Sequence, residues 1–210
     1  MKKTTNGKAK QAPAAPRVAI LMGSDSDWGV MSAASDRLAS FGVAHEAHVL
    51  SAHRSPEETA QFARDAKKRG LAVFICGAGA AAHLAGAVSA QTTLPVLGVP
   101  LDASGLGGLD ALLATVQMPA GIPVGTLAIG KAGADNAAIL AVQILALSDP
   151  DLAVELEGYK VGLAEGVAEK DRRLQESIAA KRPSAARTIA GKAREADAAV
   201  SARRGARPRI

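Results

Sequence analysis

Residues 17–27, RVAILMGSDSD, decide the fold class of this chain. The run at residues 17–22 has the length and apolar composition of a buried β-strand, and Gly23 ends it. Residues 27–41 follow with apolar positions at helical spacing. A strand that is apolar throughout, rather than at alternate positions, is typical of a parallel sheet covered on both faces. We therefore expect this strand to lie inside such a sheet.

The alternation of strand and helix continues along the chain. Four further apolar runs are expected to be strands, at residues 43–50, 71–76, 95–99 and 123–129. Helices are expected over residues 55–69, from the run GAGAAAH onward and over residues 134–147. Right-handed crossovers then place helices on both faces of the sheet. The predicted fold is α/β: a three-layer α/β/α sandwich with a central parallel sheet, flavodoxin-like or Rossmann-like, plus a C-terminal helix.

Ser55 and Pro56 predict the start of the second helix. Serine is a favoured N-cap residue, and proline is favoured in the first turn. Glu58 has the spacing from Ser55 that a capping box requires. We therefore expect Ser55 and Glu58 to cap this helix reciprocally.

Positive charge is concentrated at the two ends of the chain. The net charge is +5, yet residues 18–180 hold 18 acidic and 11 basic residues. The two ends contain no aromatic side chain, so they predict at most weak, nonspecific contact with nucleic acid. The expected divisions are a basic, disordered N-terminal extension (1–16), a catalytic α/β domain (17–148), a C-terminal helix packing on the domain or on a neighbouring subunit (149–182) and a basic tail (183–210).

The composition restricts the class of protein. Of the 210 residues, 48% are hydrophobic and only 2% aromatic, so aliphatic side chains must fill the core. The single cysteine, Cys76, excludes an internal disulfide and is typical of a reducing compartment. No apolar run approaches the roughly 20 residues that span a bilayer, and no signal-peptide pattern follows the basic start. We expect a cytoplasmic protein without membrane contact.

Three polar loops follow predicted strands. They are GSDSD at residues 23–27, SAHRSPE at residues 51–57 and GAGAAAH at residues 77–83. The carboxyl ends of parallel strands meet at one edge of a sheet, where α/β proteins bind their ligands. We therefore expect the three loops to form one site.

His53 and Arg54 carry the chemistry of this expected site. An imidazole can exchange a proton near neutral pH, and a guanidinium fork matches a phosphate. The N–H groups and hydroxyls of GSDSD could also hold a phosphate, although a plain capping turn is the alternative. Asp25 and Asp27 would oppose an anion, and they are better suited to accept hydrogen bonds from sugar hydroxyls.

The run CGAGAAAHL supports a competing interpretation. It contains G-x-G-x-x-A at a strand-to-helix junction, with Asp102 after the next strand, which is typical of dinucleotide binding. Against this, the run follows the third strand rather than the first, and His83 stands where the pyrophosphate would lie. His45 and His48 fall on opposite faces of a strand, so no metal site is predicted.

Several runs, in this order, resemble the PurE family: GSDSDW, SAHRSPE, GAGAAAHLAG, LPVLGVPL and GLDALLATVQMPAGIPVGTLAIGKAGADNAAILA. The resemblance extends over about residues 17–147. It implies an enzyme of purine biosynthesis that moves a carboxylate from the exocyclic nitrogen to ring carbon C4 of an aminoimidazole ribonucleotide, without a cofactor or metal. It also implies a homo-octamer. Two alternatives stay open: a carboxylase that uses free CO2 on the same nucleotide, and a non-catalytic nucleotide-binding relative.

The resemblance also implies roles for single residues. His53 is the implied catalytic base, which removes the proton from C4. The implied substrate-binding residues are Ser24, Asp27, Ser51, Arg54, Gly79, Ala80 and His83. The third loop departs from the family pattern, because Ala80, Ala85 and Ala87 replace Gly, Pro and Met. If position 80 requires a positive φ, its alanine costs on the order of 1 kcal/mol.

Overall fold

The computed structural model describes residues 15–181. The expected tail at residues 183–210, and all but two residues of the expected N-terminal extension, lie outside the described residues. The chain divides into two compact units, with the boundary after Glu157. The first unit contains the sheet, and the second contains most of the last helix. In the described part of the chain, no helix is both long enough and apolar enough to span a membrane.

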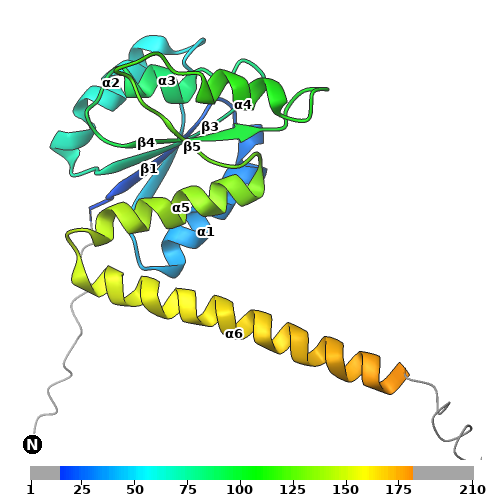
Figure 1. Ribbon diagram of the computed structural model, residues 1–210. Helices are drawn as coiled ribbons and strands as arrows, with labels where there is room; N and C mark the ends of the chain where they lie inside the picture. Colours follow the sequence, from blue (N-terminus) through cyan, green and yellow to red (C-terminus); the bar gives the residue numbers. More distant parts are fainter. Residues whose placement is uncertain (1–14, 182–210) are drawn as a thin grey trace, which may run out of the picture. The chain divides into compact units, whose positions relative to one another are not determined.

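Five parallel strands form the sheet, in the order β2-β1-β3-β4-β5 (Figure 1). Val18 of the central strand β1 lies opposite His45 of β2 and Val73 of β3, so the first three strands start in register. This arrangement confirms the predicted fold class. The strands are β1 Val18–Met22, β2 His45–Val49, β3 Val73–Gly79, β4 Val96–Leu101 and β5 Gly125–Thr126.

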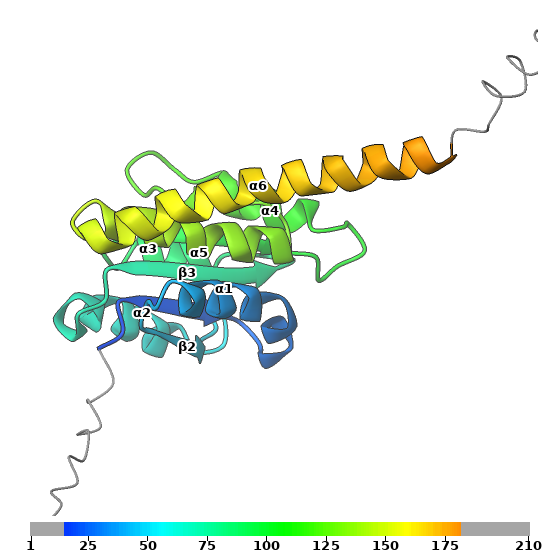
Figure 2. The same cartoon turned by 90° about the horizontal axis from the view of Figure 1, so that it is seen from below.

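Helices cover both faces of the sheet. Helices α1 and α5 pack side by side on one face, and α2, α3 and α4 cover the other (Figures 1 and 2). Helix α4 was not predicted, and the expected strand at 123–129 is reduced to the two residues of β5. The helices are α1 Trp28–Ser40, α2 Pro56–Asp65, α3 Leu84–Ser89, α4 Leu109–Val116, α5 Lys131–Ala146 and α6 Pro150–Lys181, with 3-10 turns η1 Asp25–Asp27 and η2 Ala66–Arg69.

Small residues allow the helices to approach the sheet closely. All five residues of β1 are buried, and a β-carbon at Gly77 of β3 would overlap the side chain of Met31 on α1. A β-carbon at Gly133 of α5 would overlap the carbonyl oxygen of Ala128. Cys76 lies in this core, and burial raises the pKa of its thiol, so it packs as an apolar residue.

Candidate functional site

The loops after β1, β2 and β3 surround a cavity of about 410 Å³ at the carboxyl ends of the strands. Of the eight residues proposed from the sequence, all but His83 line it. Ala103, in the loop after β4, also lines the cavity and was not proposed. Its position after a strand could have suggested it, because it lies on the same edge of the sheet.

The first loop is held by a capping box. The hydroxyl of Ser24 accepts the N–H of Ser26 at 3.3 Å, and a carboxylate oxygen of Asp27 accepts the N–H of Ser24 at 3.1 Å. Burial raises the pKa of Asp27, while its backbone hydrogen bonds and the charge of Arg54 oppose that shift. The loop therefore directs one half-buried carboxyl and two serine hydroxyls toward the cavity.

The second loop is joined to the first by Arg54. Its guanidinium donates to the carbonyl oxygen of Gly23, and its Nε donates to the hydroxyl of Ser51 at 3.3 Å. The same hydroxyl accepts the N–H of Arg54 at 3.2 Å. These bonds set the cation at the edge of the cavity, between the ends of β1 and β2.

The capping box expected at Ser55 is not formed. Ser55 is the N-cap of α2, but its hydroxyl makes no capping hydrogen bond. It instead accepts the N–H of Ser51 at 3.0 Å and donates to the carbonyl oxygen of Ser51 at 3.2 Å. Closing the His53 loop therefore uses the hydroxyl that the helix end would have required.

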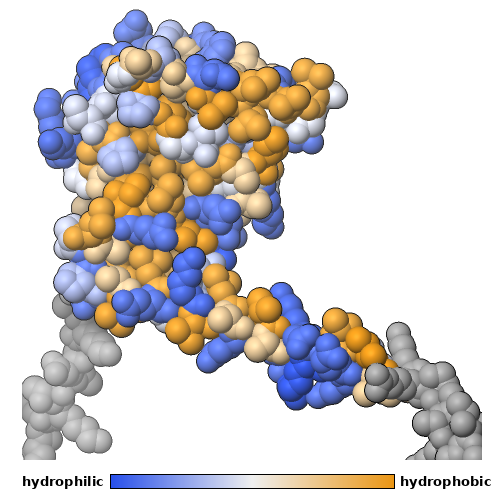
Figure 3. All heavy atoms as spheres, viewed as in Figure 1, coloured by the Kyte–Doolittle hydropathy of each residue, from blue (hydrophilic) through white to orange (hydrophobic). Residues whose placement is uncertain are grey.

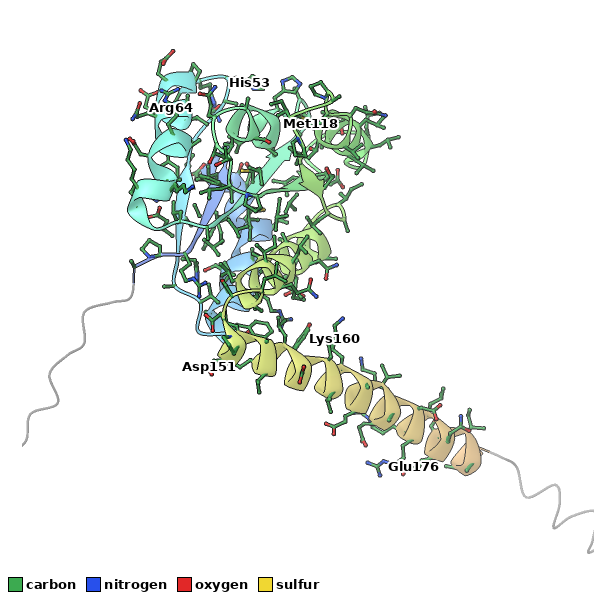
Figure 4. All side chains as sticks on the ribbon, turned by 60° about the vertical axis from the view of Figure 1, so that its left-hand side comes forward. His53, Arg64, Met118, Asp151, Lys160 and Glu176 are labelled. Carbon is green, nitrogen blue, oxygen red and sulfur yellow. The ribbon has the colours of Figure 1, made fainter. Side chains whose placement is uncertain are left out.

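His53 and His83 contact each other across the cavity edge. Nε2 of His53 lies 2.9 Å from Nδ1 of His83, and the ring centroids are 5.1 Å apart at an interplanar angle of 79°. One of the two nitrogens must donate a hydrogen and the other must accept it. Two doubly protonated rings could not make this bond. Figure 4 shows His53 and Met118, which belongs to the loop after α4, on the same side of the sheet.

The third loop contains a strained residue. Ala80 has a φ of 49°, and no other non-glycine residue in the described part of the chain has a positive φ. Two tight turns follow, in which the N–H groups of Ala82 and His83 bond to carbonyl oxygens two residues earlier, each at 2.8 Å. A β-carbon at Gly79 would overlap the side chain of Ala103. The loop therefore packs closely on its neighbour and brings His83 back toward His53.

A metal site does not emerge among residues 15–181. No three His, Cys, Asp or Glu side chains gather there closely enough to hold an ion. The imidazole of His45 makes two hydrogen bonds elsewhere: its Nε2 lies 2.7 Å from the hydroxyl of Ser35, and its Nδ1 lies 2.9 Å from the carbonyl oxygen of Val43.

Comparisons with known proteins agree on one family. The AIR carboxylase family model matches residues 17–165. Proteins named N5-carboxyaminoimidazole ribonucleotide mutase are 54% identical over 153 residues in Brucella melitensis and 52% identical over 160 residues in Mycobacterium tuberculosis. The matched parts cover 73% and 76% of this chain, and 94% and 91% of those proteins.

A solved structure shows the same fold. The crystal structure of Treponema denticola PurE superposes with a TM-score of 0.68 at 28% identity, covering 76% of this chain and 98% of that one. The family match includes all three loops and the G-x-G-x-x-A run, which removes the main support for a dinucleotide site. On the sequence match and the fold together, this chain belongs to the AIR carboxylase family.

Proposed function

We propose that this protein is an N5-carboxyaminoimidazole ribonucleotide mutase, an isomerase of purine biosynthesis. Its substrate would be the ribonucleotide that carries a carboxylate on the exocyclic nitrogen N5, and its product the C4-carboxylated isomer. Relatives with that name are 50–54% identical to this chain. The observation that carries the proposal is the cavity, because His53, Arg54 and the capped first loop all line it. Its volume lies within the range of small-molecule sites.

The reaction requires one proton to move. Breaking the bond between N5 and the carboxylate releases CO2 and leaves a nitrogen that takes up a proton. The electron-rich ring then attacks CO2 through C4, and C4 loses its proton as the ring regains aromaticity. No net proton is gained or lost, so one group that donates to N5 and then accepts from C4 is sufficient. A histidine can perform both steps.

His53 is the group that we assign to this transfer. It lies in the cavity wall, and the exposed His83 is the neighbour that holds its Nε2. A substrate proton can reach Nε2 of His53 only after the hydrogen bond to His83 is broken. Because His83 touches His53 but does not line the cavity, we assign it to orienting the ring rather than to the chemistry.

The remaining loop residues would hold the nucleotide. Arg54 would bind the 5-phosphate together with the hydroxyls of Ser24 and Ser51, because a guanidinium and hydroxyl donors complement an oxyanion. Asp27 would accept hydrogen bonds from the ribose. The backbone at Gly79 and Ala80 would enclose the CO2, which offers little to hold it except the shape of the cavity.

The protein would act as a homo-octamer in the cytoplasm. An exposed apolar patch supports assembly, because apolar surface of this kind marks contacts between proteins. Figure 3 shows hydrophobic side chains gathered where α4 lies. The patch residues and their exposed fractions are Leu106 (67%), Leu109 (54%), Leu113 (49%) and Val116 (49%). The basic ends of the chain would add weak, salt-sensitive contact with nucleic acid and no catalysis.

One alternative is retained, namely a carboxylase that takes CO2 from solution. The third loop resembles the mutase type despite its three alanines, and the shape of this loop decides whether CO2 stays enclosed or exchanges with the solvent. Freshly prepared substrate with a labelled carboxylate, in unlabelled bicarbonate, separates the two. A mutase yields labelled C4 product, whereas a carboxylase yields product with the label of the buffer.

His53→Asn tests the assignment of the proton carrier. Turnover in an ultraviolet assay should fall by at least roughly 100-fold, the lower range for a general acid–base, while a product analogue still binds. His48→Asn is the matched control, because His48 lies outside this cavity, and it should keep turnover within a few fold. Near-normal turnover in His53→Asn would contradict the assignment.

A further inference from the structure

The cavity has a polar half and an apolar half. All six polar side chains that line it, among them His53 and Arg54, come from the loops after β1 and β2. On the side of β3 and β4, the lining residues have no polar side chain, and they are Ala78, Gly79, Ala80, Ala81, Leu84 and Ala103. A part of the substrate that enters this apolar half therefore meets only aliphatic groups and backbone, so its fit depends on the shape of the wall.

Ala103 forms part of that wall by packing on the third loop. Among the residues that line the cavity, only Ala103 comes from the loop after β4. A β-carbon at Gly79 would overlap the methyl group of Ala103, so this methyl group lies directly over the backbone of Gly79. The side chain at position 103 thus stands beside the part of the third loop at which CO2 would be enclosed.

Hydrogen bonds fix the backbone on both sides of this methyl group. The N–H of Ala103 donates to the carbonyl oxygen of Leu101 at 3.1 Å. The hydroxyl of Ser104 donates to a carboxylate oxygen of Asp110 at 2.8 Å and accepts the N–H of Leu106 at 3.1 Å. Asp110 belongs to the first turn of α4, so the loop is tied to that helix. A larger side chain at position 103 is therefore held at the wall and takes up space within the cavity.

We propose that the small side chain of Ala103 is what allows the cavity to accept the carboxyl group on C4, so that residue 103 determines the specificity for carboxylated over uncarboxylated nucleotide. This role rests on the proposed function, which sets C4 of the imidazole ring toward the apolar half. The polar half would hold the phosphate and the ribose, which the two nucleotides share. The size of residue 103 therefore affects the carboxylated nucleotide alone.

Calorimetric titration of the full chain with two nucleotides tests this role. One is aminoimidazole ribonucleotide, and the other is the same nucleotide with a carboxylate on C4. In Ala103→Val, the affinity for the carboxylated nucleotide should fall by at least roughly 10-fold relative to the affinity for the uncarboxylated one, because adding methyl groups to an occupied space carries a penalty of this order. Ala103→Ser, which is closer in size to alanine, should lower this ratio less than Ala103→Val does.

Ala132→Val on α5 is the matched control. Ala132 is exposed and does not line the cavity, so the same two added methyl groups should leave both affinities as they are in the parent protein. Ala103 is exposed as well, so neither valine overpacks the core, and both variants should keep the Tm of the parent. With the labelled substrate, Ala103→Val should also release more decarboxylated nucleotide per turnover than the parent, because less space remains for CO2.

The outcomes separate this role from the proposed function. If both nucleotides bind the parent and Ala103→Val weakens them equally, or weakens neither, then residue 103 does not determine specificity by its size, and only this inference is wrong. The inference is also wrong if Ala103→Ser lowers the ratio as much as Ala103→Val does, because a change of size would then not be the cause. If the parent binds neither nucleotide, the proposed function fails and this role fails with it.

Discussion

Ala80→Gly tests whether the third loop stores strain. Ala80 has a φ of 49°, a left-handed conformation in which the methyl group of an L-residue crowds the following carbonyl oxygen. That crowding costs about 1–2 kcal/mol. Glycine avoids it, but loses about 0.5–1 kcal/mol more conformational free energy on folding than alanine does. We therefore expect Ala80→Gly to raise the free energy of unfolding by roughly 0.5–1 kcal/mol.

Ala81→Gly supplies the matched control. Ala81 is exposed in the same loop, and its φ is not positive. The substitution therefore has only the entropic cost and should lower stability by about 0.5–1 kcal/mol. The difference between the two variants isolates the strain at position 80, about 1–2 kcal/mol. For a chain of this size, that corresponds to a difference in Tm of about 2–8 °C.

The assay is thermal unfolding of the two variants and the parent protein at one protein concentration, because assembly shifts the apparent stability. Ala80→Gly should have the highest Tm and Ala81→Gly the lowest. If both variants fall below the parent by the same amount, the positive φ costs nothing, and the argument for stored strain is wrong.

Three further predictions concern the core and the site. Gly133→Ala should lower the free energy of unfolding by roughly 3 kcal/mol, because the added β-carbon would overlap a backbone oxygen. Gly29→Ala on α1, measured beside it by urea unfolding, has open space and should be neutral or slightly stabilising. The stability of Asp27→Asn relative to the parent should increase as the pH rises from 3.8, the ordinary pKa of an aspartate, through the raised pKa of Asp27 in the folded protein, because burial disfavours the ionised carboxyl. A difference in stability that is constant from about pH 3 to about pH 7 would contradict this. Replacing Ala85 by Pro and Ala87 by Met should reduce any release of CO2 during turnover, measured as the yield of decarboxylated nucleotide, and an unchanged yield would show that the alanines are neutral.

The strands could be predicted where the apolar run itself ends. Residues 17–22 and 71–76 are bounded by glycine or polar residues, and they match β1 and β3 within a few residues. The run at 123–129 is equally apolar, yet only Gly125–Thr126 pairs with β4, because apolar character does not reveal whether a neighbouring strand is present. Helix α4 was missed because leucines occupy its exposed side, so it lacks a polar face.

The site shows the same limit of local patterns. Ser24 with Asp27, and Ser55 with Glu58, present the same capping pattern, yet only the first forms the box. The difference lies outside the helix, because the Ser55 hydroxyl bonds to the backbone of Ser51 in the preceding loop. A pattern four residues long contains no information on such a competing partner.

The contact between His53 and His83 follows from the order of the strands. In the order β2-β1-β3, the loop after β1 stands between the other two, and at its end the chain turns to the face covered by α1. The chain leaves β2 and β3 toward the opposite face, where α2 and α3 pack together. The two loops that carry histidine therefore converge in front of the first loop, and the cavity opens where the first loop diverges from them.

Thirty residues separate the histidines in sequence, yet this topology sets them within hydrogen-bonding distance. Arg54 then has to reach across the end of β1, which it does through the carbonyl oxygen of Gly23. Placing a proton carrier and a cation on one loop is effective here because the neighbouring strand ends supply the other walls.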